Sequence, residues 1–191
     1  SIKTLFMDLS GSIWVGTYYG GVNFLDKQNS NFKNYSHKSG SLGLTYDVMS
    51  AMIEDSSGNI YFGTEGGGIN ILNPKTGGLE FILKDNAPNS ISSNNIKSLY
   101  LDKQTNLLVG TYNGGLNILD GKSRRVLQFK NDPARKSSLS DNDIYSIVPQ
   151  NDTLFWLGTH GGGLNLFNLK SGEFIHFREG PEPGLSSDFI R

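Results

Sequence analysis

The stretch Gly-Thr-Tyr-Tyr-Gly-Gly at residues 16–21 decides the fold, because its Gly-Thr-x-x-Gly-Gly pattern returns three more times in the chain. The later copies begin at Gly63, Gly110 and Gly158, so the spacings are 47, 47 and 48 residues. A fixed period of this length is typical of a repeat architecture. Apolar runs precede and follow every copy, and nearly all of the 191 residues therefore belong to one unit written four times.

Each repeat is expected to contain four short strands, since its apolar runs are short and are separated by turn residues. The second strand is apolar without alternation, which indicates that both of its faces are buried. The expected strands are 2–7, 49–54, 96–101 and 144–149 at the first position, 13–17, 60–64, 107–111 and 155–159 at the second, 22–26, 69–73, 116–120 and 164–168 at the third, and 32–35, 79–83, 126–129 and 174–177 at the fourth.

Recurring aspartates mark the turn before the second strand. Asp8 is followed by Gly11, and Asp55 and Asp102 stand at the same repeat position. An Asp side chain bonds nearby backbone groups, and Gly accepts a positive φ, so we interpret these acids as turn formers and not as catalytic groups. The third repeat has Thr105 where the glycine is expected, and the fourth repeat lacks both residues, so its turn must close differently.

These features predict an all-β fold, a β-propeller segment of four four-stranded antiparallel blades. We place the blades at about 2–48, 49–95, 96–143 and 144–189, with the start of a fifth repeat at 185–191. A parallel β-helix is the alternative, but its coils are shorter and need no tight hairpins. The hairpin Tyr112-Asn113-Gly114 carries the Asn-Gly signature of a type I′ turn.

Composition limits the classes of partner. The net charge is −1 and no basic stripe is present, so nucleic acid is not an expected ligand. No apolar run approaches the roughly 20 residues that span a bilayer, so direct membrane insertion of this segment is not expected. The absence of cysteine excludes disulfides, thiolate metal sites and thiol nucleophiles.

The motif from Asp8 to Asp26, Asp-x-x-Gly-x-Ile-Trp-Val-Gly-Thr-x-x-Gly-Gly-Val-Asn-x-Leu-Asp, resembles the two-component regulator propeller repeat. The segment Ser138–Ile144, which leads into the fourth unit, matches the same family, and the resemblance covers essentially the whole chain. It implies part of a larger, typically seven-bladed propeller from the periplasmic sensor region of a Bacteroidetes hybrid histidine kinase. Such sensors typically respond to glycans. The implied partners are an oligosaccharide, further blades and the sandwich domain of the parent chain.

The residues themselves offer little chemistry. The three histidines, His37, His160 and His176, fall at unrelated repeat positions, and no metal-ligand spacing appears, so no metal and no cofactor are expected. A glycosidase needs two carboxylates within roughly 5–10 Å of each other, and Glu65 is the one acid at a hairpin tip. We therefore expect no catalytic residues and no enzyme activity in this segment. A glycan-degrading propeller enzyme stays open as an alternative.

The two residues between Gly-Thr and Gly-Gly vary most between repeats, which favours a role in binding. This hairpin should lie on the same rim as the connections between blades, Ser36–Asp47, Lys84–Asn95, Lys130–Asp143 and Arg178–Asp188. A ring of tyrosine, amide, carboxylate and imidazole groups suits a sugar. The candidate ligand-binding residues are Tyr18, Tyr19, Glu65, Tyr112, Asn113 and His160. The alternatives are solvent-exposed tips without a ligand, or a rim that binds a partner protein.

Other recurring residues are interpreted as structural. Trp14 and Trp156 occupy equivalent strand positions and are expected in the core, whereas His176 is expected on the surface of an outer strand. The first and fourth units carry the same apolar strands as the middle ones, so the open faces predict either closure of four blades or, preferably, a homodimer. The asparagines inside the third strand, expected to satisfy buried backbone groups, are Asn23, Asn70, Asn117 and Asn165.

Overall fold

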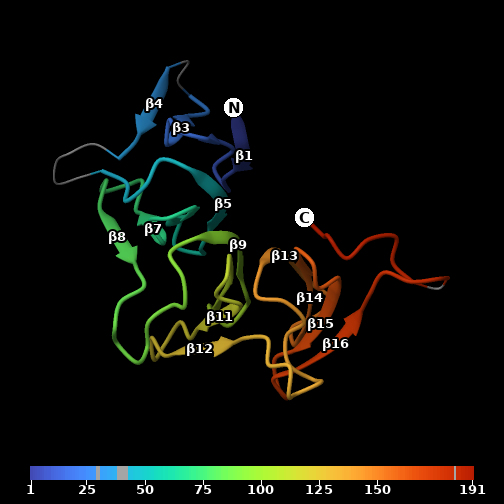
Figure 1. Cartoon of the computed structure of the whole chain (residues 1–191). Helices are drawn as coiled ribbons and strands as arrows, with labels where there is room; N and C mark the ends of the chain where they lie inside the picture. Colours follow the sequence, from blue (N-terminus) through green and yellow to red (C-terminus); the bar gives the residue numbers. More distant parts are fainter. Residues whose placement is uncertain (29–30, 38–42, 183) are drawn as a thin grey trace. The chain divides into compact units, whose positions relative to one another are not determined.

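The computed structural model describes residues 1–28, 31–37, 43–182 and 184–191. Within these residues the chain forms four four-stranded sheets and no helix, and each sheet follows the chain order of its strands. Every pairing for which the register is given is antiparallel, as in a propeller blade (Figure 1). The all-β propeller fold expected from the repeat is confirmed. Parts of two predicted connections, 38–42 and 183, lie outside the described residues.

The strand bounds agree with the predicted ones to within one residue. Blades 1 to 4 are β1–β4, β5–β8, β9–β12 and β13–β16. The strands are β1 (Ile2–Met7), β2 (Ile13–Thr17), β3 (Val22–Leu25), β4 (Phe32–Tyr35), β5 (Met49–Glu54), β6 (Ile60–Thr64), β7 (Ile69–Leu72), β8 (Leu79–Ile82), β9 (Ile96–Leu101), β10 (Leu107–Thr111), β11 (Leu116–Leu119), β12 (Val126–Phe129), β13 (Ile144–Pro149), β14 (Leu154–Thr159), β15 (Leu164–Asn168) and β16 (Glu173–Phe177).

The chain groups into two compact units. Unit 1 comprises Ser1–Lys84 with Asn94–Ile96 and contains blades 1 and 2. Unit 2 comprises Asp85–Ser93 with Lys97–Arg191 and contains blades 3 and 4 apart from Ile96. In unit 1 the fully buried Trp14 of β2 lies against Phe24 of its own blade, at 4.3 Å between ring centroids, and against Phe62 of blade 2, at 5.6 Å. The core of this unit therefore lies between its two blades.

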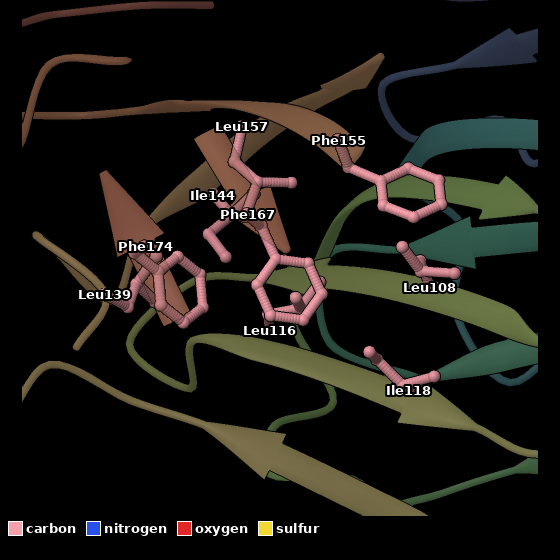
Figure 2. Packing of buried hydrophobic residues seen from close by; sticks show 9 residues of the cluster. All are labelled: Leu108, Leu116, Ile118, Leu139, Ile144, Phe155, Leu157, Phe167 and Phe174. Carbon is pink, nitrogen blue, oxygen red and sulfur yellow. The ribbon is translucent and has the colours of Figure 1, made fainter. Parts of the chain in front are cut away.

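Unit 2 is built in the same way. Figure 2 shows Phe155, Phe167 and Phe174 of blade 4 in one cluster with Leu108 and Ile118 of blade 3. Phe167 stacks on Phe174 at 4.7 Å between ring centroids. Burial of such large apolar side chains between sheets is the main stabilising term of this unit.

The first glycine of the repeat motif allows the inner strands to approach one another. A Cβ added at Gly110 of β10 would overlap the Ser98 hydroxyl and would lie 2.8 Å from the Ile144 carbonyl oxygen of the next blade. At Gly158 the added atom would overlap the Ser146 hydroxyl and lie 2.6 Å from Ile190. In both blades a glycine on the second strand therefore packs closely against a small side chain on the first strand.

The aspartate turns form as predicted. Asp8 Oδ1 accepts hydrogen bonds from the backbone N–H groups of Ser10 (3.0 Å) and Ser12 (2.8 Å), and Oδ2 accepts one from Trp14 Nε1 (2.8 Å). Partial burial acts to raise the pKa of Asp8, but the bonds from Ser10, Trp14 and Ser12 outweigh it and leave the pKa below its ordinary value. Asp55 and Asp102 accept the equivalent backbone bonds in blades 2 and 3.

Thr105 adopts the backbone conformation of the glycine that it replaces. Its φ is 67°, against 86° at Gly11 and 85° at Gly58. The fourth turn closes differently, as predicted: Asn151 Oδ1 accepts the N–H groups of Thr153 and Leu154, both at 2.9 Å.

Replacement of Thr105 by glycine is expected to raise the free energy of unfolding by about 1 kcal/mol. A side chain in the left-handed region costs roughly 1–2 kcal/mol, and the extra entropy of an unfolded glycine cancels part of that gain. Urea denaturation followed by circular dichroism measures the change. The reverse substitution at the equivalent position, Gly58→Thr, serves as the control and should destabilise the chain. A lower free energy of unfolding in Thr105→Gly would contradict the inference that the backbone of Thr105 is strained.

Two predictions about burial are wrong in part. The second strand is buried on both faces in blade 3, but in blade 1 only alternate residues of β2 are buried. Trp156 is half-buried although Trp14 is fully buried. Trp14 points to the face that blade 2 covers through Phe62. Along β14, Phe155 and Leu157 join the core shared with blade 3, so Trp156 points to the opposite face, which no described blade covers. There it lies 5.4 Å from Phe177, between ring centroids. No helix in the described part of the chain is long and apolar enough to cross a membrane.

Candidate ligand-binding rim

The hairpin between the second and third strands has the same construction in every blade. Thr111 donates from its N–H (3.2 Å) and from its hydroxyl (2.8 Å) to the carbonyl oxygen of Gly115, which closes a five-residue loop. Thr17, Thr64 and Thr159 make the same pair of bonds. The predicted type I′ turn is wrong: Asn113 has a φ of 59°, but the next positive value is at Gly115 (76°), not at Gly114. We call the four loops 17–21, 64–68, 111–115 and 159–163 the hairpin tips.

Backbone bonds tie each hairpin tip to the connection that follows its blade. The last glycine of the tip donates its N–H to a carbonyl oxygen in that connection, which in blades 1 to 3 lies just before the first strand of the next blade. The four bonds are Gly21 to Asp47 (3.1 Å), Gly68 to Asn94 (2.9 Å), Gly115 to Asn142 (2.9 Å) and Gly163 to Asp188 (2.9 Å). Tips and connections therefore share one rim of each unit, as predicted.

Buried asparagines fix the preceding connection to the same blade. Asn117 of β11 is fully buried; its Oδ1 accepts the N–H of Ser92 (2.8 Å), and its Nδ2 donates to the Ser92 hydroxyl (2.7 Å). Asn70 with Thr45 and Asn165 with Ser140 repeat both bonds. The predicted structural role of these amides is confirmed. Asn23 differs, because it is half-buried and accepts a bond from Asn34 at 3.2 Å.

In unit 1 the rim brings three of the six candidate residues together. Tyr18 and Tyr19 lie edge to face with ring centroids 4.4 Å apart, and the Tyr19 side chain is 74% exposed. Lys3 links the two tips, since its Nζ lies 3.2 Å from Glu65 Oε1 and 5.3 Å from the centroid of Tyr18. Hydrogen bonding with Tyr19 and, to a smaller extent, the nearby charge of Glu65 raise the pKa of Tyr18 above its ordinary value.

In unit 2 the other three candidates lie on two neighbouring tips. Tyr112 and Asn113 are exposed, and the N–H of Asn113 donates to Asp143 Oδ1 at 2.5 Å. His160 is half-buried, with its ring between those of Tyr145 (5.2 Å) and Phe189 (5.0 Å).

Side chains from the inner strands also reach the rim, and they are missing from the predicted site. Lys97 of β9 has its Nζ 5.7 Å from the centroid of Tyr112 and 5.3 Å from that of Tyr145. The guanidinium carbon of Arg191 lies 5.8 Å from the centroid of Tyr145. These residues share a signal in the sequence, because each directly follows an isoleucine: Lys3, Lys97 and Tyr145 follow the first residue of β1, β9 and β13, and Arg191 follows Ile190.

The remaining histidines serve the fold. His176 is only half-buried, but the prediction of a plain surface residue is wrong, because its Nε2 lies 2.7 Å from the carbonyl oxygen of Ser138. His37 Nδ1 lies 2.7 Å from the carbonyl oxygen of Leu44. No group of three or more His, Asp or Glu side chains able to hold a metal ion occurs among the residues that the structure describes.

A cavity of about 440 Å³ lies at the opposite end of the blades in unit 1, where β1 turns into β2. Phe24, Tyr35 and Lys33 of blade 1 and Glu54 of blade 2 contribute to its lining. The backbone N–H of Leu9 donates to Glu54 Oε2 at 2.7 Å, so one oxygen of this carboxylate already has a partner. Nothing in the repeat pattern predicted this cavity.

One family model matches two stretches of the chain. The family model described as two component regulator propeller matches residues 43–66 and 90–113, each from a connection to a hairpin tip. The comparison with curated proteins finds no match.

Three solved structures illustrate the likeness in fold. The extracellular domain of BT3049 from B. thetaiotaomicron, described as a hybrid two component system, is 21% identical, with a TM-score of 0.80 over 96% of this chain and 25% of that one. The extracellular domain of BT4673 from the same organism is 22% identical, with a TM-score of 0.62 over 100% of this chain and 31% of that one. Virginiamycin B lyase from Staphylococcus aureus is 17% identical, with a TM-score of 0.67 over 94% of this chain and 56% of that one. The chain thus spans about a quarter to a third of the two extracellular domains.

Proposed function

Because the chain carries repeats of the two component regulator propeller family, we propose that it is part of the ligand-sensing region of a hybrid two-component system. In this proposal the segment lies in the periplasm, recognises an oligosaccharide and passes the signal towards a histidine kinase elsewhere in the parent chain. Support comes from the matched repeats and from the fold shared with extracellular domains of such systems.

The observation that best supports a ligand-binding role is that the same hydrogen bonds recur at every hairpin tip, while the two central residues of the tip differ from blade to blade. Threonine, glycine and asparagine bonds fix every hairpin tip to its blade and to the neighbouring connections. The two variable positions at the tips of blades 1 and 3 carry exposed side chains, which are Tyr18, Tyr19, Tyr112 and Asn113. Tyrosine rings offer flat apolar faces and hydroxyl donors, a combination that suits sugar rings.

The segment is proposed to bind and not to catalyse. Glu65 is the carboxylate at a hairpin tip, and its Oε1 forms an ion pair with Lys3 at 3.2 Å. Recurring Asp8, Asp55 and Asp102 are engaged in turns at the other end of the blades.

Apolar side chains stand on the outer faces of blades 1 and 4. Leu5 and Met7 of β1 are 66% and 65% exposed, and Val148 and Ile175 of blade 4 are 54% and 60% exposed. We propose that further blades of the parent chain cover these faces, since the extracellular domains that share the fold are about three to four times as long. A sandwich domain of the parent chain is the proposed receiver of the signal. A homodimer through the same faces is the alternative, and a concentration-dependent mass in light scattering would favour it.

Substitution of Tyr18, Tyr112 and His160 together by alanine is expected to weaken oligosaccharide binding at least tenfold without changing the fold. These residues stand at the tips of three blades, and their side chains take no part in the bonds that close the hairpins. A glycan array identifies the ligand, and isothermal titration calorimetry then compares the affinities of the parent and the variant.

The control variant carries Phe32→Ala and Phe81→Ala, which remove even more exposed aromatic rings from the outer strands β4 and β8. It should bind as the parent chain does. Unchanged affinity in the triple variant, or loss of affinity in the control to the same extent, would rule out the hairpin tips as the binding site. Circular dichroism of both variants separates a binding effect from unfolding.

A further inference from the structure

The cavity of unit 1 has the size of a site for a small molecule and is separate from the rim. Its volume of about 440 Å³ falls within the roughly 300–1,000 Å³ that is usual for ligand pockets. Both blades contribute apolar surface, Phe24 and Tyr35 from blade 1 and Ile60 and Pro74 from blade 2. None of the residues described at the hairpin tips lines it. A ligand in this cavity would therefore be recognised independently of the tips.

The aromatic wall of the cavity is supported by a buried tryptophan. Trp14 is fully buried, and its ring centroid lies 4.3 Å from that of Phe24 and 6.1 Å from that of Tyr35. Its Nε1 donates to Asp8 Oδ2 at 2.8 Å, and Asp8 also lines the cavity. The rings and the carboxylate are thus positioned before a ligand binds, which lowers the entropy cost of binding.

Charged side chains of both signs line this cavity without pairing with one another. Asp8, Asp26 and Glu54 are half-buried, whereas Lys33 and Lys75 are exposed. Within the described part of the chain, no ion pair joins any of these three carboxylates to either lysine. The negative side chains are more enclosed than the positive ones, and the two signs are kept apart.

A ligand that matches this lining carries both charges and an apolar part. Its ammonium group would face the half-buried carboxylates, and its carboxylate would face the exposed lysines, with charge-assisted hydrogen bonds at both ends. Lys33 Nζ lies 4.8 Å from the centroid of Tyr35, so one positive charge already stands beside the aromatic wall. A neutral ligand would leave both sets of charges uncompensated, and a singly charged ligand would compensate one set.

We propose that the cavity between blades 1 and 2 binds a small zwitterion, an amino acid or a dipeptide with a large apolar side chain. The apolar side chain would lie against Phe24 and Tyr35, the ammonium group near Asp26 and Glu54, and the carboxylate near the lysines. This inference goes beyond the proposed oligosaccharide-sensing function and does not depend on it, because the two sites share no residue.

The first test uses the Trp14 indole as a reporter of the cavity. The chain contains two tryptophans, and the Trp14 N–H bonds to Asp8 at the cavity, whereas Trp156 lies in unit 2. In proton–nitrogen correlation spectra, L-leucine or leucyl-leucine should shift the indole signal of Trp14 and leave that of Trp156 in place. The tighter binder of the two decides between an amino acid and a dipeptide. No shift of Trp14 at millimolar concentrations of either ligand would overturn the site.

The second test removes the charges one sign at a time. N-acetyl-leucine lacks the positive charge and leucine methyl ester lacks the negative one, and each should bind at least tenfold more weakly than leucine. The variant with Asp26→Asn and Glu54→Gln should lower the affinity for leucine about tenfold and change that for N-acetyl-leucine less than twofold. The variant with Lys33→Met and Lys75→Met should do the same for leucine and the methyl ester. Equal affinities for leucine and both derivatives would overturn the proposal, a comparison that holds even where a variant fails to fold.

The control variant carries Glu80→Gln and Lys84→Met. It makes the same changes of charge at exposed side chains of blade 2 and the following connection, outside the cavity. Its affinity for leucine should stay within twofold of the parent, and so should that of the rim triple variant. Losses in this control equal to those in the cavity variants would show a general effect of charge and would overturn the assignment.

Discussion

Replacement of Gly115 by alanine is expected to lower the free energy of unfolding by about 3–4 kcal/mol. Gly115 has a φ of 76°, where a side chain costs roughly 1–2 kcal/mol. The new Cβ would also overlap the carbonyl oxygen of Phe129, a backbone atom that cannot rotate away. Overpacking of this kind costs about 1–3 kcal/mol more. Urea denaturation followed by circular dichroism gives the difference.

Gly77 provides a control with the same backbone conformation. Its φ is 75°, and nothing lies within 4 Å of the position that a Cβ would take. Gly77→Ala should therefore cost only the backbone strain, roughly 1–2 kcal/mol. Similar losses in the two variants would mean that the close approach of the hairpin tip to Phe129 contributes nothing to stability.

Asn117→Ala is expected to lower the free energy of unfolding by about 3 kcal/mol. The change removes both bonds to Ser92 from a side chain that has no exposed surface. The Ser92 N–H is then left buried without its acceptor, at about 1–3 kcal/mol, and a small cavity adds to this. Hydrogen exchange should show the amide of Ser92 losing its protection, because the connection before blade 3 is no longer held.

Asn23→Ala is the matched control at the same repeat position. Asn23 is half-buried and accepts one bond at 3.2 Å from Asn34, so its loss should cost less than about 1 kcal/mol. Equal effects of the two substitutions would show that the asparagine contributes only its strand packing. Faster exchange throughout unit 2, rather than at Ser92, would show that Asn117 stabilises the whole unit and not this connection in particular.

The strands could be predicted because every blade places apolar residues at the same repeat positions. Apolar runs of fixed spacing, bounded by Asp and Gly, predicted β9 and β13 with their observed bounds. Burial of individual side chains was less predictable, since it depends on whether another blade packs on that face of the sheet. Trp14 and Trp156 are equivalent in sequence, but only Trp14 lies between two blades of the described chain.

Local turn chemistry and the site could be predicted only in part. Asn-Gly at 113–114 favours a type I′ turn, but the bonds from Thr111 to Gly115 impose a longer loop. The tips were identifiable because their two central residues vary between repeats. Lys97 was missed because a single cation within an inner strand looks like an ordinary polar alternation, and Arg191 was missed because it lies outside the predicted strands. Their convergence on Tyr145 depends on the approach of neighbouring blades, which no single repeat encodes.

The bonds from the last glycine of each tip to the following connection have a consequence for how propellers with this repeat can diversify. Donor and acceptor are both main-chain atoms, as in the bond from Gly115 to Asn142. The stiffness of the rim is therefore independent of the side chains displayed on it. Exchange of the two variable residues at a tip alters the chemistry offered to a ligand and leaves its mechanical support intact. A scaffold of this kind can acquire new specificities by point substitution alone, without re-optimising the fold each time.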